Sequence, residues 1–122
     1  ACVRQATRVP NLPPIVDIAL GQHHSCALDY QGRVWCWGDN EKGQLGIGEA
    51  GRTRLNGGTT SRVPLLVGRL TDITNITAGI SSNCARSTPG QVYCWGENHG
   101  GQLGNGNCAA AVPAPIEVDF GF

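Results

Sequence analysis

The chain has 122 residues, enough for one ordinary domain, and its nine acidic and nine basic residues give a formal net charge of zero. A balanced charge offers no general reason to expect a nucleic-acid-binding surface. Eighteen Gly and seven Pro favour turns over long helices, and no apolar run is long enough to span a membrane. We therefore expect a turn-rich protein with no nucleic-acid partner and no membrane span in this chain, which leaves association with a membrane complex open.

Cysteine and methionine usage indicates the compartment. Six Cys form an even set in a short chain, as is typical of an oxidising environment. The gap between Cys26 and Cys36 is wider than a zinc ribbon uses, so a zinc site is disfavoured. Because the chain contains no Met, we expect a processed or excised segment, and a cleaved signal peptide would leave such a start. These features predict an extracytoplasmic protein, whether secreted, periplasmic or on the cell surface.

One stretch of sequence occurs twice and organises the whole chain. Residues 25–48 return as residues 83–106, so that Cys26 recurs as Cys84 and Trp37 as Trp95, at an offset of 58 residues. A fixed period of this size is typical of stacked supersecondary units, as in a solenoid or a propeller. We predict one repeat domain over residues 1–122, made of a tail strand of a preceding unit (1–14), a first repeat (15–70), a second repeat (71–112) and the first strand of an incomplete third unit (113–122).

Short segments rich in β-branched residues predict the strands of the first repeat. Ile15–Gly21 reads as a strand, and His23–Asp29 and Arg33–Gly38 read as two more, joined by a three-residue turn at 30–32. Gly32 is well placed for the left-handed residue of such a turn. The second repeat carries a matching turn at residues 88–90. Each repeat should therefore contain a tight antiparallel hairpin.

The two hairpins predict two disulfides. Counting inward from the first turn places Cys26 opposite Cys36 at a non-hydrogen-bonded pair, where side chains approach closely enough for a cross-strand disulfide. The second turn places Cys84 opposite Cys94 in the same way. The remaining residues, Cys2 and Cys108, have no Cys at the repeat offset, and they could pair within one chain or between chains.

Alternation along the first hairpin gives it two apolar faces. Blades of a propeller are covered on both faces by their neighbours, so this pattern suits a blade. Arg86 stands where Leu28 stands in the first repeat, and we expect it at an edge or in contact with a partner. One face carries Cys26, Leu28, Val34 and Cys36, and the other carries Ala27, Trp35 and Trp37.

Segments outside the strands supply the other candidate partner contacts. The Gly- and Asn-rich residues 38–48 read as a structured turn that serves backbone geometry. The loop at 48–63 is nine residues longer than its counterpart at 106–112, and it is either a solvated loop or a partner contact. The two Phe near the end of the chain either dock on a partner or only cover an open sheet edge. The candidates are Tyr30 at the hairpin tip, Arg52, Arg54 and Arg62 in the long loop, Arg86, Phe120 and Phe122.

Motifs for catalysis are missing from the sequence. It contains no nucleophile elbow, phosphate-binding loop, zinc-protease motif or paired-carboxylate motif, so we predict no enzyme activity, no cofactor and no metal. Asn75-Ile76-Thr77 matches an N-glycosylation acceptor, but it falls on a predicted strand, and a chance match is favoured.

The repeated pattern resembles that of the regulator-of-chromosome-condensation repeat family. Members are similar to one another in forming β-propellers, usually of about seven four-stranded blades, so the resemblance implies an all-β fold with two propeller-type blades and an incomplete propeller. The paired Cys resemble bacterial secreted members more than the nuclear exchange factor, and His23 is expected to be structural. The pattern is carried by Gly21, His23, Ser25, Ala27, Leu28, Gly32, Val34, Trp37, Gly38, Asn40, Gly43, Gln44, Leu45 and Gly46, and again by Gly79, Ala85, Gly90, Val92, Trp95, Gly96, Asn98, Gly101, Gln102, Leu103 and Gly104.

Two blades leave an apolar blade face and sheet edges uncovered, which bears directly on function. We predict a non-catalytic protein-binding or assembly subunit of a larger extracytoplasmic complex, whose partner is another protein or further copies of itself, and which is not a free monomer. One alternative is a fragment of a secreted recognition or inhibitor propeller similar to the β-lactamase-inhibiting relative, for which Tyr30 sits at a comparable hairpin tip. A guanine-nucleotide exchange factor is less favoured, because disulfides do not suit a reducing nucleus.

Overall fold

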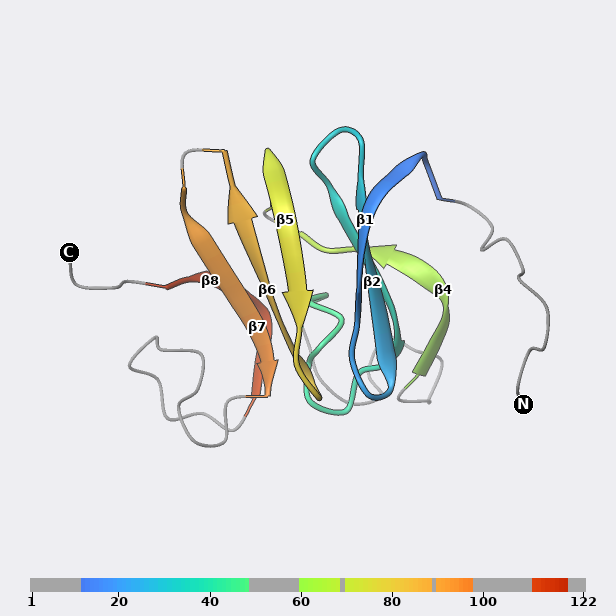
Figure 1. Cartoon of the computed structure of the whole chain (residues 1–122). Helices are drawn as coiled ribbons and strands as arrows, with labels where there is room; N and C mark the ends of the chain where they lie inside the picture. The colour runs from blue at the N-terminus through green and yellow to red at the C-terminus, as the bar shows by residue number, and fades with distance from the viewer. Residues whose placement is uncertain (1–11, 49–59, 69, 89, 98–110, 119–122) are drawn as a thin grey trace.

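The computed structural model of the chain describes residues 12–48, 60–68, 70–88, 90–97 and 111–118. These residues form two four-stranded antiparallel sheets whose strands follow sequence order, β1-β2-β3-β4 and β5-β6-β7-β8 (Figure 1). The predicted all-β architecture of two blades is confirmed. The strands are β1 Ile15–Leu20, β2 His24–Asp29, β3 Val34–Asp39, β4 Thr60–Leu66, β5 Ile73–Ala78, β6 Ser82–Ser87, β7 Val92–Glu97 and β8 Ala111–Glu117.

The first hairpin turns as the sequence predicts. The amide of Asp29 donates to the carbonyl of Arg33 at 2.9 Å, which closes a three-residue loop. Gly32 occupies the last loop position at φ 79°, in the left-handed region where a side chain would be strained. Gly90 takes the matching place in the second hairpin at φ 93°.

A buried carboxylate holds the first hairpin together. One oxygen of Asp29 accepts from the amides of Gln31 at 2.8 Å and Arg33 at 2.9 Å. The other oxygen accepts from Arg33 Nε at 2.9 Å and from Trp35 Nε1 at 3.0 Å. Burial alone would raise the pKa of Asp29, but these hydrogen bonds outweigh it and leave the pKa below its usual value. Asp29 therefore stays ionised and orients Trp35 on the outer face of the hairpin.

Both predicted disulfides are present. Cys26 lies opposite Cys36, and Cys84 lies opposite Cys94, with a Cα–Cα distance of 4.1 Å in each pair. This short distance fits the closely spaced pairs of an antiparallel ladder. The predictions for Cys2 and Cys108 fall outside the described residues.

The main core lies between the two sheets. From the first sheet it takes the disulfide face that contains Leu28 and Val34, which are 1% and 0% exposed. From the second sheet it takes Ile73, Ile76 and Trp95, which lie on the face turned towards the first sheet. A smaller cluster around Cys94 and Val112 lies on the other face of the second sheet. The first sheet is therefore covered on one side by the second sheet.

The end of the chain corrects one prediction. We expected residues 113–122 to begin a third unit, but β8 pairs with β7, with Ile116 opposite Cys94, and completes the second sheet. In the first sheet β4 completes the ladder in the same way, with Leu65 opposite Cys36. Residues 64–67 (Pro-Leu-Leu-Val) resemble residues 115–118 (Pro-Ile-Glu-Val) because both belong to a fourth strand, which pairs with the edge that β3 or β7 would otherwise expose.

The two disulfides should differ in how much they stabilise the fold. Each joins residues 10 apart, so chain entropy predicts a loss of about 3 kcal/mol for either pair replaced by Ala. Cys26 and Cys36 are also 1% and 0% exposed in the core between the sheets, and their loss should add about 1 kcal/mol through packing. Urea unfolding should give a lower midpoint for the double Ala variant at Cys26 and Cys36 than for the variant at Cys84 and Cys94. Equal midpoints would contradict this difference.

Candidate functional site

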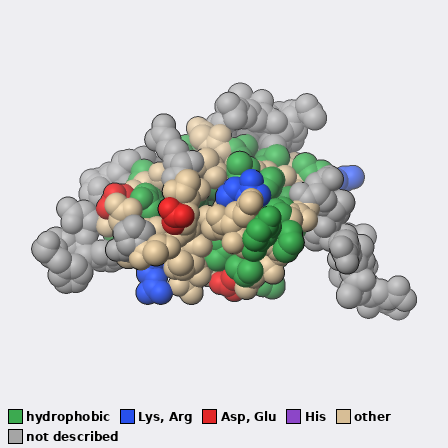
Figure 2. All heavy atoms as spheres, turned by 90° about the horizontal axis from the view of Figure 1, so that it is seen from above, with side chains coloured by type: hydrophobic (Ala, Val, Ile, Leu, Met, Phe, Trp, Pro, Cys, Tyr) green, Lys and Arg blue, Asp and Glu red, His purple; other side chains and the backbone are tan. Residues whose placement is uncertain are grey.

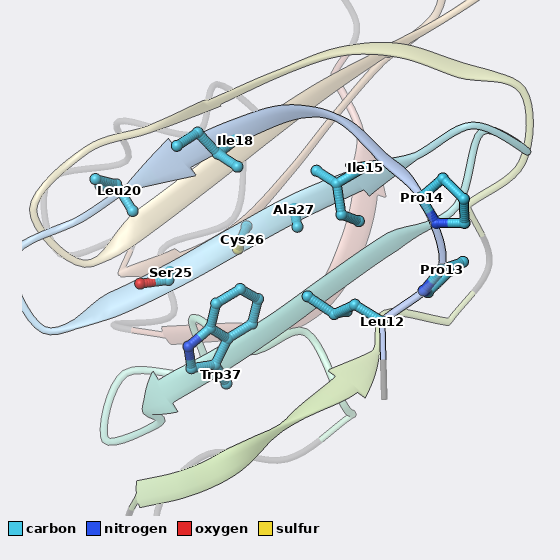
Figure 3. A pocket seen from close by; sticks show the side chains of 10 residues that line it. All are labelled: Leu12, Pro13, Pro14, Ile15, Ile18, Leu20, Ser25, Cys26, Ala27 and Trp37. Atoms are coloured by element: carbon cyan, nitrogen blue, oxygen red, sulfur yellow. The ribbon is translucent and has the colours of Figure 1, made fainter. Parts of the chain in front are cut away.

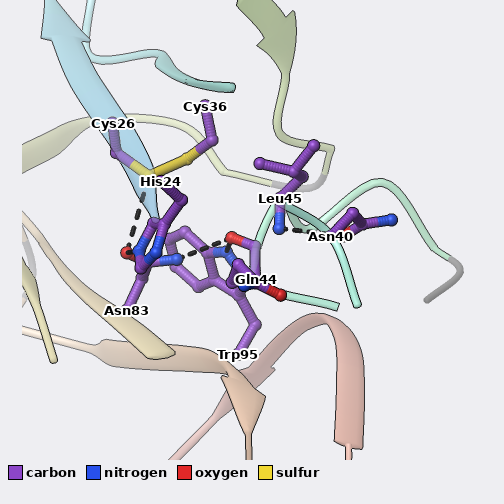
Figure 4. The surroundings of a disulfide bond; sticks show 8 residues. All are labelled: His24, Cys26, Cys36, Asn40, Gln44, Leu45, Asn83 and Trp95. Atoms are coloured by element: carbon purple, nitrogen blue, oxygen red, sulfur yellow. Dashed lines mark hydrogen bonds between the residues drawn. A yellow bond between two sulfur atoms is a disulfide. The ribbon is translucent and has the colours of Figure 1, made fainter. Parts of the chain in front are cut away.

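One backbone carbonyl anchors the contact between the sheets. The carbonyl of Gln44, in the turn after β3, accepts hydrogen bonds from Asn83 Nδ2 at 2.6 Å and Trp95 Nε1 at 3.0 Å (Figure 4). Asn83 and Trp95 belong to the second sheet and are 2% and 0% exposed. Both lone pairs of the carbonyl are therefore used in a place from which water is excluded. This contact fixes how the turn sits on the second sheet.

The turn itself is shaped for that contact. Asn40 Oδ1 accepts from the amide of Leu45 at 3.1 Å, which caps the turn and presents Leu45 to the core at 0% exposure. Gly43 and Gly46 have φ angles of 78° and 68°. A Cβ on Gly46 would lie 2.9 Å from Trp95 Nε1, so any larger residue would push the indole away. The predicted structural role of this turn is confirmed, and packing on the second sheet adds a second reason for its glycines.

A buried histidine completes the contact. His24 Nε2 lies 2.8 Å from Asn83 Oδ1 (Figure 4). Because Asn83 donates through its nitrogen to Gln44, its oxygen is the acceptor, and His24 Nε2 carries the proton. His24 Nδ1 is buried without a hydrogen-bond partner among the described residues. Burial lowers the pKa of His24, and the hydrogen bond to Asn83 and the charge of Asp39 offset this only in part.

The structure corrects the assignment of the structural histidine. We expected His23 to fill this role, but His23 is exposed, whereas His24 is 4% exposed. The repeat pattern places its His directly before Ser-Cys, which is the position of His24. His24 also shares the face of Cys26, and this face meets the second sheet.

The opposite face of the first sheet is open. Ile18 and Leu20 are 60% and 65% exposed there, whereas Ile76, the counterpart of Ile18 in the second sheet, is 7% exposed. A groove of about 670 Å³ runs along this open face (Figure 3). Hydrophobic side chains also gather at the surface in the right half of the view from above (Figure 2). The groove is lined by Leu12, Pro13, Pro14, Ile15, Ile18, Leu20, Ser25, Cys26, Ala27 and Trp37.

The predicted contact residues do not form one site. Tyr30 is 60% exposed at the tip of the first hairpin, and Arg62 is exposed in β4. Arg86 is exposed on the second sheet, where its Nη2 donates to Asn75 Oδ1 at 2.9 Å beside a small polar groove. Neither of the two described grooves is lined by more than one of these three residues. The remaining candidates, Arg52, Arg54, Phe120 and Phe122, fall outside the described residues.

The sequence predicts an uncovered blade face but not the residues that form the contact surface on it. The uncovered blade face was expected, but Ile18, Leu20, Ser25 and Trp37 were not singled out as contacts. The repeat offset is the signal that could have found them, because it maps them onto residues of the second sheet that face the first.

The described residues show neither a metal site nor a membrane helix. Within these residues, no three His, Cys, Asp or Glu side chains are grouped so that they could hold a metal ion. No helix in this part of the chain is long and apolar enough to cross a bilayer.

The fold and the contact between the sheets define a protein built from propeller-type blades. Its sequence matches one model of the regulator of chromosome condensation (RCC1) repeat at residues 15–44 and 73–102. A second model with the same description matches residues 31–86 and 89–121. The chain belongs to the RCC1 repeat family.

Several known proteins are similar to parts or all of the chain. Human RCC2 is 37% identical over 100 residues, which make up 80% of this chain and 17% of RCC2. The mouse regulator of chromosome condensation is 35% identical over 103 residues, or 84% of this chain and 23% of that protein. The crystal structure of human WBSCR16 has a TM-score of 0.79 at 22% identity and covers 98% of this chain and 29% of its own. The chain thus spans about a fifth of the length of human RCC2 and of the mouse regulator of chromosome condensation, which are animal proteins.

Asn83 should matter far more to stability than its counterpart in the first repeat. Asn83→Ala leaves the Gln44 carbonyl with one donor and His24 Nε2 with no acceptor, so we expect a loss of about 2–3 kcal/mol in the free energy of unfolding. Ser25→Ala, at the matching position on the open face, should change it by less than about 0.5 kcal/mol. Urea unfolding measures both variants, and similar losses would contradict the anchoring role of Asn83.

Stability should fall as the solution becomes more acidic, because of His24. Its pKa is lower in the folded protein than the ordinary value of 6.5, so below about pH 6.5 the unfolded chain takes up the proton first. Stability is therefore greatest above this pH and declines as the pH falls towards the folded-state pKa. His24→Gln, which keeps a donor for Asn83, should reduce the change in the urea midpoint between pH 7 and pH 5. His23→Gln should leave that change as it is in the wild-type protein. An unchanged slope in His24→Gln would assign the pH dependence to another group.

Proposed function

We propose that this chain is a non-catalytic subunit that assembles with another protein, or with further copies of itself, through the open face of its first sheet. The observation that supports this most directly is the exposure of Ile18 and Leu20, at 60% and 65%, on a face that also carries Trp37. Burying one such aliphatic side chain stabilises a contact by about 1.5–3 kcal/mol. A continuous apolar surface of this kind marks a contact with another molecule.

The polar groups between the sheets support binding over catalysis. The hydrogen bonds across the sheet interface form one connected group. Asn83 and Trp95 donate to the Gln44 carbonyl, and His24 bonds to Asn83. They hold the fold and do not face the open groove. Binding to other proteins is known in this family, since the yeast relative Prp20p binds Gsp1p and histones and a complex of Kap60 with yeast RCC1 has been crystallised.

We further propose that the assembly lies outside the cytoplasm, in a secreted, periplasmic or cell-surface complex of the bacterial type. The support is the disulfide in each sheet, because disulfides persist in oxidising compartments and are rare in the cytosol and nucleus. The same argument disfavours a nuclear exchange factor. Association with a membrane-bound complex is compatible with such a location.

A second candidate is a recognition or inhibitor module that binds through the hairpin tips. Tyr30 supports it, because an aromatic ring 60% exposed at the end of a hairpin fixed by Asp29 is a rigid contact residue. Arg62, exposed in β4, is the described member of the predicted basic loop. In this case Tyr30→Ala would weaken partner binding and substitutions on the open face would not.

Assembly through the open face should show in the mass of the native particle. Without reductant, light scattering at increasing concentration should give a mass above that of the 12.8 kDa chain. Leu20→Asp should return the particle to the monomer, because it places a charge in the apolar contact. Ile80→Asp is the matched control, since Ile80 is 68% exposed but does not line the groove, and it should leave the mass unchanged. A wild-type chain that stays monomeric would contradict self-assembly and favour the recognition module.

A further inference from the structure

We infer that the disulfide Cys84–Cys94 is a thiol-exchange site, at which a small anionic thiol attacks Cys84 and the guanidinium of Arg86 stabilises the anionic sulfur. This inference goes beyond the proposed assembly and does not depend on it, because it concerns the second sheet and not the open face of the first.

The two disulfides occupy matching places in the repeat but differ in their cover. The inner disulfide, Cys26–Cys36, lies in the core between the sheets, where its cysteines are 1% and 0% exposed. Asn83 Oδ1 of the second sheet lies 3.5 Å from Cys26 Sγ (Figure 4). The outer disulfide, Cys84–Cys94, lies on the other face of the second sheet. In the described part of the chain, no third sheet covers that face.

Cys84 is the accessible sulfur of the outer disulfide. It is half-buried, whereas Cys94 is 4% exposed and packs in the small apolar cluster of this face. The residue opposite Cys84 is Thr77, which is exposed, whereas the residue opposite Cys26 is Ala19, which is buried. Because thiol–disulfide exchange requires access to a sulfur atom, an external thiol can reach Cys84 while the protein stays folded.

Arg86 places a positive charge beside the outer disulfide. It lies opposite Val92, and these two residues form the next cross-strand pair on the same face. The diagonal distance between neighbouring pairs is within reach of a long side chain. Arg86 Nη2 donates to Asn75 Oδ1 at 2.9 Å, and among the described residues Arg86 forms no ion pair with a carboxylate. A free guanidinium stabilises a nearby thiolate, so it favours both the approach of an anionic thiol and the departure of a thiolate.

The exchange needs no oxidant. The external thiolate attacks Cys84 Sγ, a new S–S bond forms there, and the bond between Cys84 and Cys94 breaks. The electron pair of the broken bond leaves on Cys94 Sγ as a thiolate, which takes a proton from water. The product carries the small thiol on Cys84 and a free thiol on Cys94.

The test is timed reduction of the folded full-length chain, with Cys2→Ser and Cys108→Ser so that no other cysteine takes part. The reductant is dihydrolipoate, an anionic dithiol whose second thiol closes a cyclic disulfide and so completes the reduction. Samples are blocked with N-ethylmaleimide, and mass spectrometry of peptides measures the loss of each disulfide. We expect the outer disulfide to be lost at least about 10-fold faster than the inner one, which opens only when the sheets separate. Urea well below the unfolding midpoint should speed reduction of the inner disulfide only.

Glutathione, an anionic monothiol, tests which sulfur is attacked. After a short exposure to excess glutathione and blocking with N-ethylmaleimide, the glutathione should be found on Cys84 and the maleimide on Cys94.

Two Arg variants test the role of the charge. Arg86→Leu introduces the residue that the first repeat has at this position, and it should slow reduction of the outer disulfide by dihydrolipoate about threefold. Arg62→Leu removes the same charge from an exposed position in β4 and should leave the rate unchanged. Dithiobutylamine, a cationic dithiol, should show no such loss of rate in Arg86→Leu.

Three results would overturn the inference. Equal rates for the two disulfides would mean that both are reduced only through the unfolded chain. Glutathione found on Cys94 would assign the attack to the other sulfur. Equal rates in Arg86→Leu and Arg62→Leu would show that the guanidinium has no part in the exchange.

Discussion

The buried backbone carbonyl of Gln44 is the polar anchor of the contact between the two sheets, within the apolar core that they share. The Gln44 carbonyl lies in an apolar core, and it is tolerated there because Asn83 and Trp95 both donate to it. This one contact explains the glycine at position 46, which must leave room for the indole, and the Asn40 cap, which presents the turn. It also explains the buried His24, whose Nε2 takes the remaining oxygen of Asn83. A repeated turn that resembles a simple loop is therefore part of the contact surface between the two sheets.

The contact between the sheets joins two different faces, and this asymmetry determines which face of the first sheet stays open. The first blade offers its turn and disulfide face on one side, and on the other side an indole with small and aliphatic residues. In this chain the turn of the first blade fills the indole side of the second, while the indole side of the first stays open. In repeat proteins stability comes largely from such contacts between neighbours. A head-to-tail contact of this kind can be repeated without limit unless a ring closes or a cap intervenes.

The hairpins can be predicted from the local sequence, whereas the features that depend on packing between the strands and sheets cannot. A three-residue turn with Gly32 in the left-handed region fixes the register, so Cys26 and Cys36 must face each other. Nothing local distinguishes a fourth strand from the first strand of a new unit, so the sequence predicts a third unit at residues 113–122, and only the pairing of β8 with β7 identifies a fourth strand. Burial separates His24 from its neighbour His23, and it depends on the other sheet. The open face is predictable as a pattern, but which copy is covered depends on how the blades stack.

The differences between the repeats then carry more information about assembly than their identities. Identical residues such as Trp37 and Trp95 show only that both sheets carry an indole on the same face. Asn83 donates to the Gln44 carbonyl and accepts from His24, whereas the matching position of the first repeat holds the shorter Ser25, and the position that matches His24 holds Ser82. Because a buried imidazole needs a hydrogen-bond partner, His24 is matched to Asn83 on the sheet that it faces, and the two repeats are not interchangeable at this contact. Two polar positions thus distinguish repeats whose apolar residues are nearly the same.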